Sequence, residues 1–131
     1  METQPDFRDL LALFNSHKVE YLIVGGYALA FHGAPRFTGD IDIFIKPDNN
    51  NATHILEALG DFGFGSLDLS TDDFATPNNV IQLGVPPVRV DLLTSISGVD
   101  WDKAYKHKVA GTYGDIDVFY IGLKEFEANK L

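Results

Sequence analysis

The stretch that decides the fold reads Thr38-Gly39-Asp40-Ile41-Asp42-Ile43-Phe44-Ile45-Lys46. Its alternation has the period of two that is typical of a β-strand, so we predict a strand over Gly39 to Lys46. The isoleucines share one face and are expected in the core, whereas Asp40, Asp42, Phe44 and Lys46 share the other. Carboxylates two residues apart on a strand lie about 7 Å apart at the backbone. Such a pair on a rigid strand is suited to bind Mg²⁺ through oxygen ligands.

A glycine-rich turn precedes this strand. Val19 to Val24 is a short apolar run that stops at Gly25 and Gly26, which predicts a buried strand, a tight turn and then a short helix from Tyr27 to Gly33. Backbone N–H groups at a glycine turn and a helix N-terminus bind anions, and phosphate oxygens approach closely where Cβ atoms are missing. The sequence therefore combines a phosphate-binding turn with a metal-binding pair.

A third carboxylate stands in the segment Val88-Arg89-Val90-Asp91-Leu92, where alternation turns Asp91 away from the apolar side of its strand. If this strand pairs beside the strand Gly39 to Lys46, Asp91 would complete a cluster of three carboxylates. Such a cluster can hold two metal ions about 3.5 to 4 Å apart, as in phosphoryl and nucleotidyl transfer. The alternative is a cross-strand ion pair with Arg89. Arg36, Lys46 and Arg89 are candidate triphosphate ligands, with ion pairing or solubility as the alternative role.

The same pattern recurs as Tyr113-Gly114-Asp115-Ile116-Asp117. No glycine turn precedes this copy at a matching distance, and no later strand supplies a third acid. We therefore interpret Gly114 as part of a hairpin turn and the two aspartates as structural.

The remaining pattern predicts an α+β fold in one domain, residues 1–131: a small mixed sheet of about four to five strands, with helices mainly on one face and the carboxylates on the other. Residues 66–79 are polar and aperiodic and are expected to form a loop. Further strands are predicted at 79–84, 88–94 and 116–121, and further helices at 5–17, 54–59, 100–106 and 123–131.

Composition narrows the choice of partners. The chain has 19 Asp and Glu against 10 Lys and Arg, a net charge of −9, which argues against a broad basic face for duplex nucleic acid. Cysteine is absent, so thiolate chemistry is excluded. The longest uncharged stretch, 21–35, is shorter than the roughly 20 apolar residues that a membrane helix needs. We expect a cytoplasmic protein with no membrane contact. An unpaired strand at the edge of the sheet would also allow the protein to form a homodimer.

These motifs resemble the DNA polymerase beta-type nucleotidyltransferase superfamily, in its small prokaryotic branch of minimal nucleotidyltransferases and of abortive-infection and toxin–antitoxin components. The resemblance rests on Gly25-Gly26, Asp40-Ile41-Asp42 and Asp91. It implies that Asp40 and Asp42 hold Mg²⁺ (or Mn²⁺) and the triphosphate, that Asp91 is the third metal ligand, and that the glycines contact phosphates. It also implies transfer of a nucleoside monophosphate from a triphosphate such as ATP to a hydroxyl on a small molecule, an RNA end or a protein, and a cognate toxin or antitoxin as partner.

The sequence departs from this family at two places. Many active members carry Ser where this chain has Gly26, so one hydroxyl contact to phosphate is absent. Relatives commonly continue past the position of Lys130, so the chain is expected to be a trimmed form or one that takes this segment from a partner. The alternative function is a catalytically inactive module of the same fold that masks a protein partner. A distance above about 8 Å from Asp91 to both other aspartates would favour it.

Overall fold

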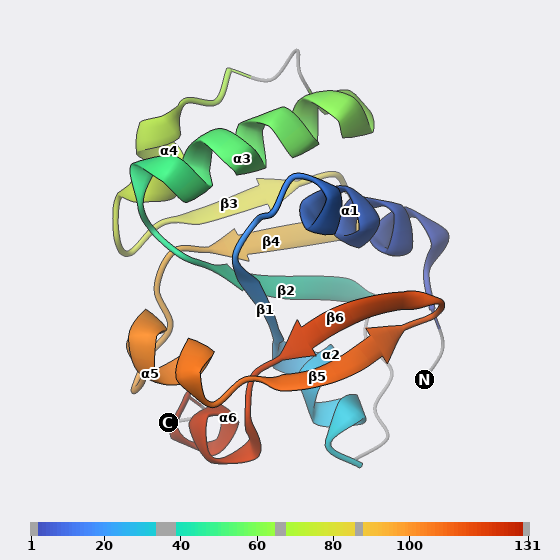
Figure 1. Ribbon diagram of the computed structural model, residues 1–131, viewed down its shortest axis with the longest axis vertical. Helices are drawn as coiled ribbons and strands as arrows, with labels where there is room; N and C mark the ends of the chain where they lie inside the picture. Colours follow the sequence, from blue (N-terminus) through green and yellow to red (C-terminus); the bar gives the residue numbers. More distant parts are fainter. Residues whose placement is uncertain (1–2, 34–38, 65–67, 86–87, 130–131) are drawn as a thin grey trace.

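Strand β2 (Asp40–Ile45) lies inside a six-stranded sheet of order β3-β4-β2-β1-β6-β5, drawn in Figure 1. The computed structural model describes residues 3–33, 39–64, 68–85 and 88–129. The other strands are β1 (Tyr21–Val24), β3 (Val80–Leu83), β4 (Arg89–Leu93), β5 (Val109–Tyr113) and β6 (Ile116–Tyr120). The helices are α1 (Pro5–Ser16), α2 (Gly25–Phe31), α3 (Asn49–Leu59), α4 (Thr71–Ala75), α5 (Trp101–Lys106) and α6 (Leu123–Asn129), with a π-helical turn η1 (Gly60–Phe64) after α3.

The sheet is mixed, and this confirms the α+β class. Strand β1 pairs antiparallel with β2 and parallel with β6, while β2 pairs parallel with β4. The outer strands β3 and β5 are antiparallel to β4 and β6. The count of six exceeds the expected four to five because β5 forms a hairpin with β6 around Gly114, whose φ is +61°.

The sequence pattern did not predict two elements, strand β5 and helix α4. Strand β5 is mostly exposed and contains Gly111, so it lacks the apolar alternation that marks a buried strand. A Cβ at Gly111 would press on the rings of Phe31 and Tyr120, which stack at a centroid distance of 4.0 Å. Helix α4 lies within the predicted loop 66–79. It forms because Ser70 and Asp73 make a capping box, with Ser70 N donating to Asp73 Oδ2 at 2.8 Å.

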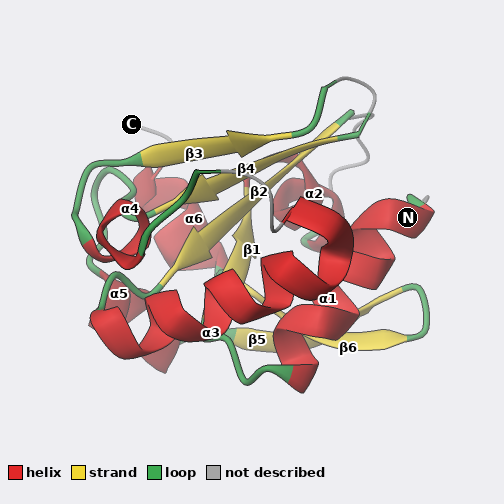
Figure 2. Cartoon of the chain, turned by 90° about the horizontal axis from the view of Figure 1, so that it is seen from above, coloured by secondary structure: helices red, strands yellow, loops and turns green. Residues whose placement is uncertain are grey.

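The isoleucine face of β2 is buried as expected. Ile41, Ile43 and Ile45 have no exposed surface. Ile45 is the register partner of Tyr21, whose ring lies 5.7 Å from that of Phe14 in α1. Helices α1 and α3 lie side by side (Figure 2) and cover this face. Burial of this apolar face ties β2 to the core and holds the opposite face rigid.

The opposite face of β2 is covered at one end by helix α5. Phe44 is only 1% exposed, and its ring lies 5.0 Å from that of Trp101 in α5. An aromatic residue among the polar positions of the strand supplies the apolar surface on which α5 packs. Helix α5 therefore covers the end of this face at Phe44, while Asp40 and Asp42 remain partly exposed.

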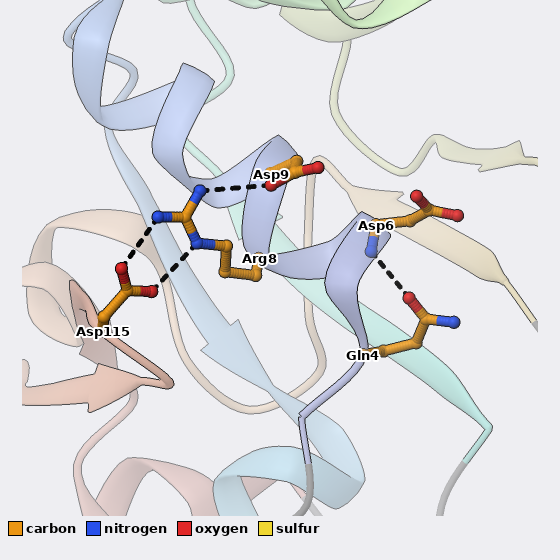
Figure 3. Close-up of polar contacts among 5 residues, drawn as sticks. All are labelled: Gln4, Asp6, Arg8, Asp9 and Asp115. Carbon is orange, nitrogen blue, oxygen red and sulfur yellow. Dashed lines mark hydrogen bonds and ion pairs between the residues drawn. The ribbon is translucent and has the colours of Figure 1, made fainter.

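The second Gly-Asp-Ile-Asp copy joins the hairpin to α1. Arg8 Nε and Nη2 donate to the two carboxylate oxygens of Asp115 at 2.9 and 2.8 Å, and Nη1 contacts Asp9 at 3.1 Å, as Figure 3 shows. Asp115 is therefore a surface ion-pair partner, in agreement with a structural role for this copy. None of the described helices is both long and apolar enough to cross a membrane.

A single buried amide connects the outer ends of β1 and β2 to α3. Asn51 is 2% exposed, accepts a hydrogen bond from the backbone N–H of Glu20 at 2.8 Å, and donates to the carbonyl oxygens of Glu20 and Lys46, both at 3.0 Å. We expect Asn51→Ala to lower the free energy of unfolding by about 2–3 kcal/mol, because it leaves these backbone groups unsatisfied. Urea denaturation measures this loss. Asn50→Ala, at an exposed position of the same helix, serves as the control, and equal losses in both variants would contradict the assignment.

Candidate active site

The strand register brings the predicted carboxylates together on one face of the sheet. Asp42 of β2 is the register partner of Asp91 of β4, and Asp40 is the partner of Arg89. Register partners on neighbouring strands point to the same side and lie about 5 Å apart at the backbone. Asp91 therefore lies well within 8 Å of Asp42. The polar side chains of β2 and β4 are therefore adjacent on the same face of the sheet.

The glycine turn lies directly against this cluster. Strand β1 ends at Val24, the register partner of Asp42, and Gly25 then opens α2 with a φ of +67°. A Cβ atom at Gly25 would overlap Oδ2 of Asp42. Glycine at this position thus has two physical reasons, its left-handed backbone and the space that the Asp42 carboxylate occupies. Gly26 follows in the first turn of α2. Gly25 of the predicted phosphate-binding turn therefore lies directly against Asp42.

The electrostatics of the cluster favour binding of a cation. Burial raises the pKa of the Asp42 carboxyl to about 6, and the nearby charges of Asp91 and Asp40 add to this increase. The positive charge of Arg89 opposes the increase and only partly offsets it. A carboxylate whose ionised form is destabilised in this way is typical of functional sites, and a bound cation would stabilise it.

Arg89 and Asp91 do form an ion pair, but within strand β4 and not across strands as the alternative had it. Arg89 Nε donates to Oδ1 of Asp91 at 3.1 Å and Arg89 Nη2 to Oδ2 at 3.0 Å, and the same Nη2 lies 3.5 Å from Oδ2 of Asp40. The hydrogen bonds with Asp91 raise the pKa of the Arg89 guanidinium. Asp91 is 8% exposed, so this pair is largely shielded from water on the carboxylate side. The ion pair is therefore present, and Asp42 and Asp40 lie beside it on the same face of the sheet.

The donor chemistry of the site fits a hard divalent cation. Asp40, Asp42 and Asp91 supply carboxylate oxygens, which are the ligands that Mg²⁺ and Mn²⁺ prefer. In the side-chain arrangement of the described residues, no group of three acidic or histidine side chains is already placed around one ion. A guanidinium nitrogen instead lies between Asp91 and Asp40. Asp40, Asp42 and Asp91 are thus the carboxylates available to a metal ion, and Arg89 occupies the position between two of them.

One of the other predicted ligands, Lys46, lies away from the carboxylates. Lys46 is six residues from Asp40 along the strand direction, roughly 20 Å away, and pairs with Glu20 at 3.5 Å and Asp48 at 3.4 Å. The structure does not bring Lys46 to the cluster. Arg36 lies outside the described residues. Sequence reasoning missed Gln82 of β3, an exposed residue that is the register partner of Asp91. The only feature of the sequence that marks Gln82 is its polar side chain within a short, otherwise apolar strand.

Comparison with solved structures shows a nucleotidyltransferase-like fold. The chain is similar to the crystal structure of a "putative nucleotidyltransferase" from Thermotoga maritima, with 18% sequence identity over 96% of this chain and 83% of that chain and a TM-score of 0.65. The model of the family described as "Nucleotidyl transferase AbiEii toxin, Type IV TA system" matches residues 7–106. The chain therefore belongs to the AbiEii nucleotidyltransferase family and is a transferase. None of the curated proteins matches the chain.

Proposed function

We propose that this protein transfers a nucleoside monophosphate from a nucleoside triphosphate to a hydroxyl group, in a reaction that depends on Mg²⁺ or Mn²⁺. The observation that carries the proposal is the register of β2 and β4, which sets Asp42 beside Asp91 with Asp40 on the same face. The contact of Gly25 with Asp42 adds the phosphate-binding turn to the same place. This proximity also favours the enzyme over the inactive partner-masking module, which a distant Asp91 would have supported.

Each residue of the cluster has a role in this mechanism. Asp40, Asp42 and Asp91 would hold the metal, which supplies charge stabilisation for the attacking oxygen and the departing pyrophosphate. The backbone N–H groups of Gly25 and Gly26 orient the phosphates. Asp91 accepts the proton of the acceptor hydroxyl, whose oxygen forms a bond to the α-phosphorus while the bond from that phosphorus to the β-phosphate bridge breaks. Pyrophosphate leaves on the side opposite the acceptor.

The family description sets the biological context of the proposal. It names a type IV toxin–antitoxin system, which suggests a nucleotide substrate and a cognate antitoxin as partner. The net charge of −9 argues against a long nucleic acid as the acceptor. We propose a hydroxyl on a small molecule, an RNA end or a protein side chain.

Calorimetric titration of ATP, GTP, CTP and UTP, each with Mg²⁺ and with a chelator, tests the proposal. We expect at least one triphosphate to bind with Mg²⁺, and Asp40→Asn/Asp42→Asn to weaken this binding by about 100-fold or more, because both metal-binding charges are lost. The matched control is Asp115→Asn/Asp117→Asn, which makes the same change in the second Gly-Asp-Ile-Asp copy. Wild-type protein that binds no triphosphate, or equal binding by the two double variants, would refute the proposed site.

A further inference from the structure

Arg89 binds both carboxylate oxygens that Asp91 would offer to a metal ion. Its Nε and Nη2 each donate to one oxygen of Asp91, and Nη2 also lies 3.5 Å from Asp40 Oδ2. A divalent cation that binds Asp91 together with Asp40 would lie next to this guanidinium, and two positive charges at such a distance repel strongly outside bulk water. The guanidinium and the metal therefore compete for the same oxygens.

Arg89 can release Asp91 only if its side chain rotates away, because its guanidinium does not lose its proton. A guanidinium keeps its positive charge throughout the physiological pH range, and the hydrogen bonds with Asp91 raise the pKa of Arg89 further. The Arg89 side chain is 33% exposed, against 11% for that of Asp91, so its outer side faces solvent and not the core. Rotation away from Asp91 therefore requires no rearrangement of the sheet.

A metal-bound triphosphate offers Arg89 a replacement partner. Its phosphate oxygens present the same forked acceptor geometry as a carboxylate, and arginine binds such groups through two parallel N–H donors. Gly25 packs against the carboxylate of Asp42, so the phosphate-binding turn adjoins the cluster that contains Arg89.

We propose that Arg89 is an internal counter-ion that holds Asp91 and Asp40 until a metal-bound triphosphate arrives, and then transfers its hydrogen bonds from these carboxylates to the phosphates. This inference rests on the proposed function and deepens it. This exchange makes metal binding and triphosphate binding interdependent. A metal ion alone must displace Arg89 from its hydrogen bonds, whereas a metal ion that arrives with its triphosphate offers Arg89 phosphate oxygens in their place. Arg89 is a positioning residue in the free protein and a phosphate ligand in the complex.

The inference predicts that one substitution changes two affinities in opposite directions. In Arg89→Gln, Mn²⁺ without nucleotide no longer competes with a guanidinium, so we expect its affinity to rise by about three- to tenfold, whereas the affinity for Mg²⁺-ATP, or for the triphosphate preferred by the wild type, should fall by about tenfold or more. Electron paramagnetic resonance of free Mn²⁺ measures the first affinity and calorimetry the second. Neither readout depends on knowing the acceptor.

Arg8 provides a matched control. It binds Asp115 through the same two atoms, Nε and Nη2, at 2.9 and 2.8 Å, on a surface of α1 outside the cluster (Figure 3). Arg8→Gln removes the same charge and the same pair of hydrogen bonds, and it should leave both affinities unchanged. Arg89→Lys keeps the charge without the fork, so Mn²⁺ affinity should stay within about threefold of the wild type while triphosphate affinity falls.

The outcomes separate this inference from the proposed function. If wild-type protein binds Mg²⁺-triphosphate but Arg89→Gln weakens Mn²⁺ binding as well, Arg89 merely orders the carboxylates and the exchange is refuted. Unchanged Mn²⁺ affinity in Arg89→Gln also refutes the exchange. Wild-type protein that binds neither Mn²⁺ nor any triphosphate refutes the proposed function itself. If Arg89→Gln does not fold, a fall in Mn²⁺ affinity of Arg89→Lys beyond about threefold contradicts the competition.

Discussion

Asp42→Asn should make the protein more stable at neutral pH while it removes metal-dependent triphosphate binding. The folded protein raises the pKa of Asp42 from 3.8 to about 6, mainly through burial and then through the neighbouring charges of Asp91 and Asp40. Well below pH 3.8 the carboxyl is neutral in both the folded and the unfolded state and costs nothing. As the pH rises from about 4 to 6 the unfolded state ionises first, so this group lowers stability progressively and its full cost is present at pH 7.

The substitution removes this cost because asparagine does not ionise. Since the Asp42 side chain is partly exposed, solvent screening reduces the expected gain to about 1–2 kcal/mol at pH 7. Urea denaturation with a chelator present, at pH 4 and at pH 7, measures the difference between wild type and variant. The gain should be much smaller at pH 4 than at pH 7, because at pH 4 only part of the ionisation difference between the two states has developed. Asp117→Asn, at an exposed hairpin position, is the control, and a gain of equal size at both pH values would argue against the assigned cause.

Gly25→Ala should damage the fold and the site together. At a φ of +67° an L-residue is strained by about 1–2 kcal/mol, and the new Cβ would overlap Oδ2 of Asp42. The variant must move either the turn or the carboxylate, so we expect a total loss of about 2–4 kcal/mol in the free energy of unfolding. Binding of Mg²⁺-triphosphate should also be lost, because the turn and Asp42 can no longer hold their present positions.

Gly114→Ala separates the two causes. Gly114 has a similar φ of +61°, but the nearest atom to its added Cβ would be Thr3 Cγ2 at 3.7 Å, an ordinary contact. This variant should therefore show only the backbone strain and keep its triphosphate binding. Urea denaturation and calorimetry on both variants make the comparison. If Gly25→Ala loses no more stability than Gly114→Ala and still binds triphosphate, the close packing of Gly25 on Asp42 has no functional meaning.

The sequence by itself determined the parts of the fold that depend on local periodicity. The alternation in 39–46 predicted β2, its buried isoleucine face and the shared side of Asp40 and Asp42, because successive side chains of a strand point to opposite faces. The stop at Gly25 predicted the turn after β1. Where the local pattern is weak the sequence was less informative: no strand was predicted at β5, which depends on its hairpin partner, and the loop predicted over 66–79 was wrong at α4, which depends on a capping box.

Only the tertiary structure decided which polar residues meet. Whether Asp91 lies beside Asp42 depends on β4 pairing in parallel with β2 across an intervening α3, α4 and β3, and no local pattern encodes that neighbour. The same pairing brings Arg89 to Asp40, while the length of β2 keeps Lys46 at the far end with Glu20 and Asp48. Period and turn chemistry are properties of a short segment, whereas strand order and register result from packing of the whole sheet, which is why the sequence supplied the carboxylates and the fold assembled them.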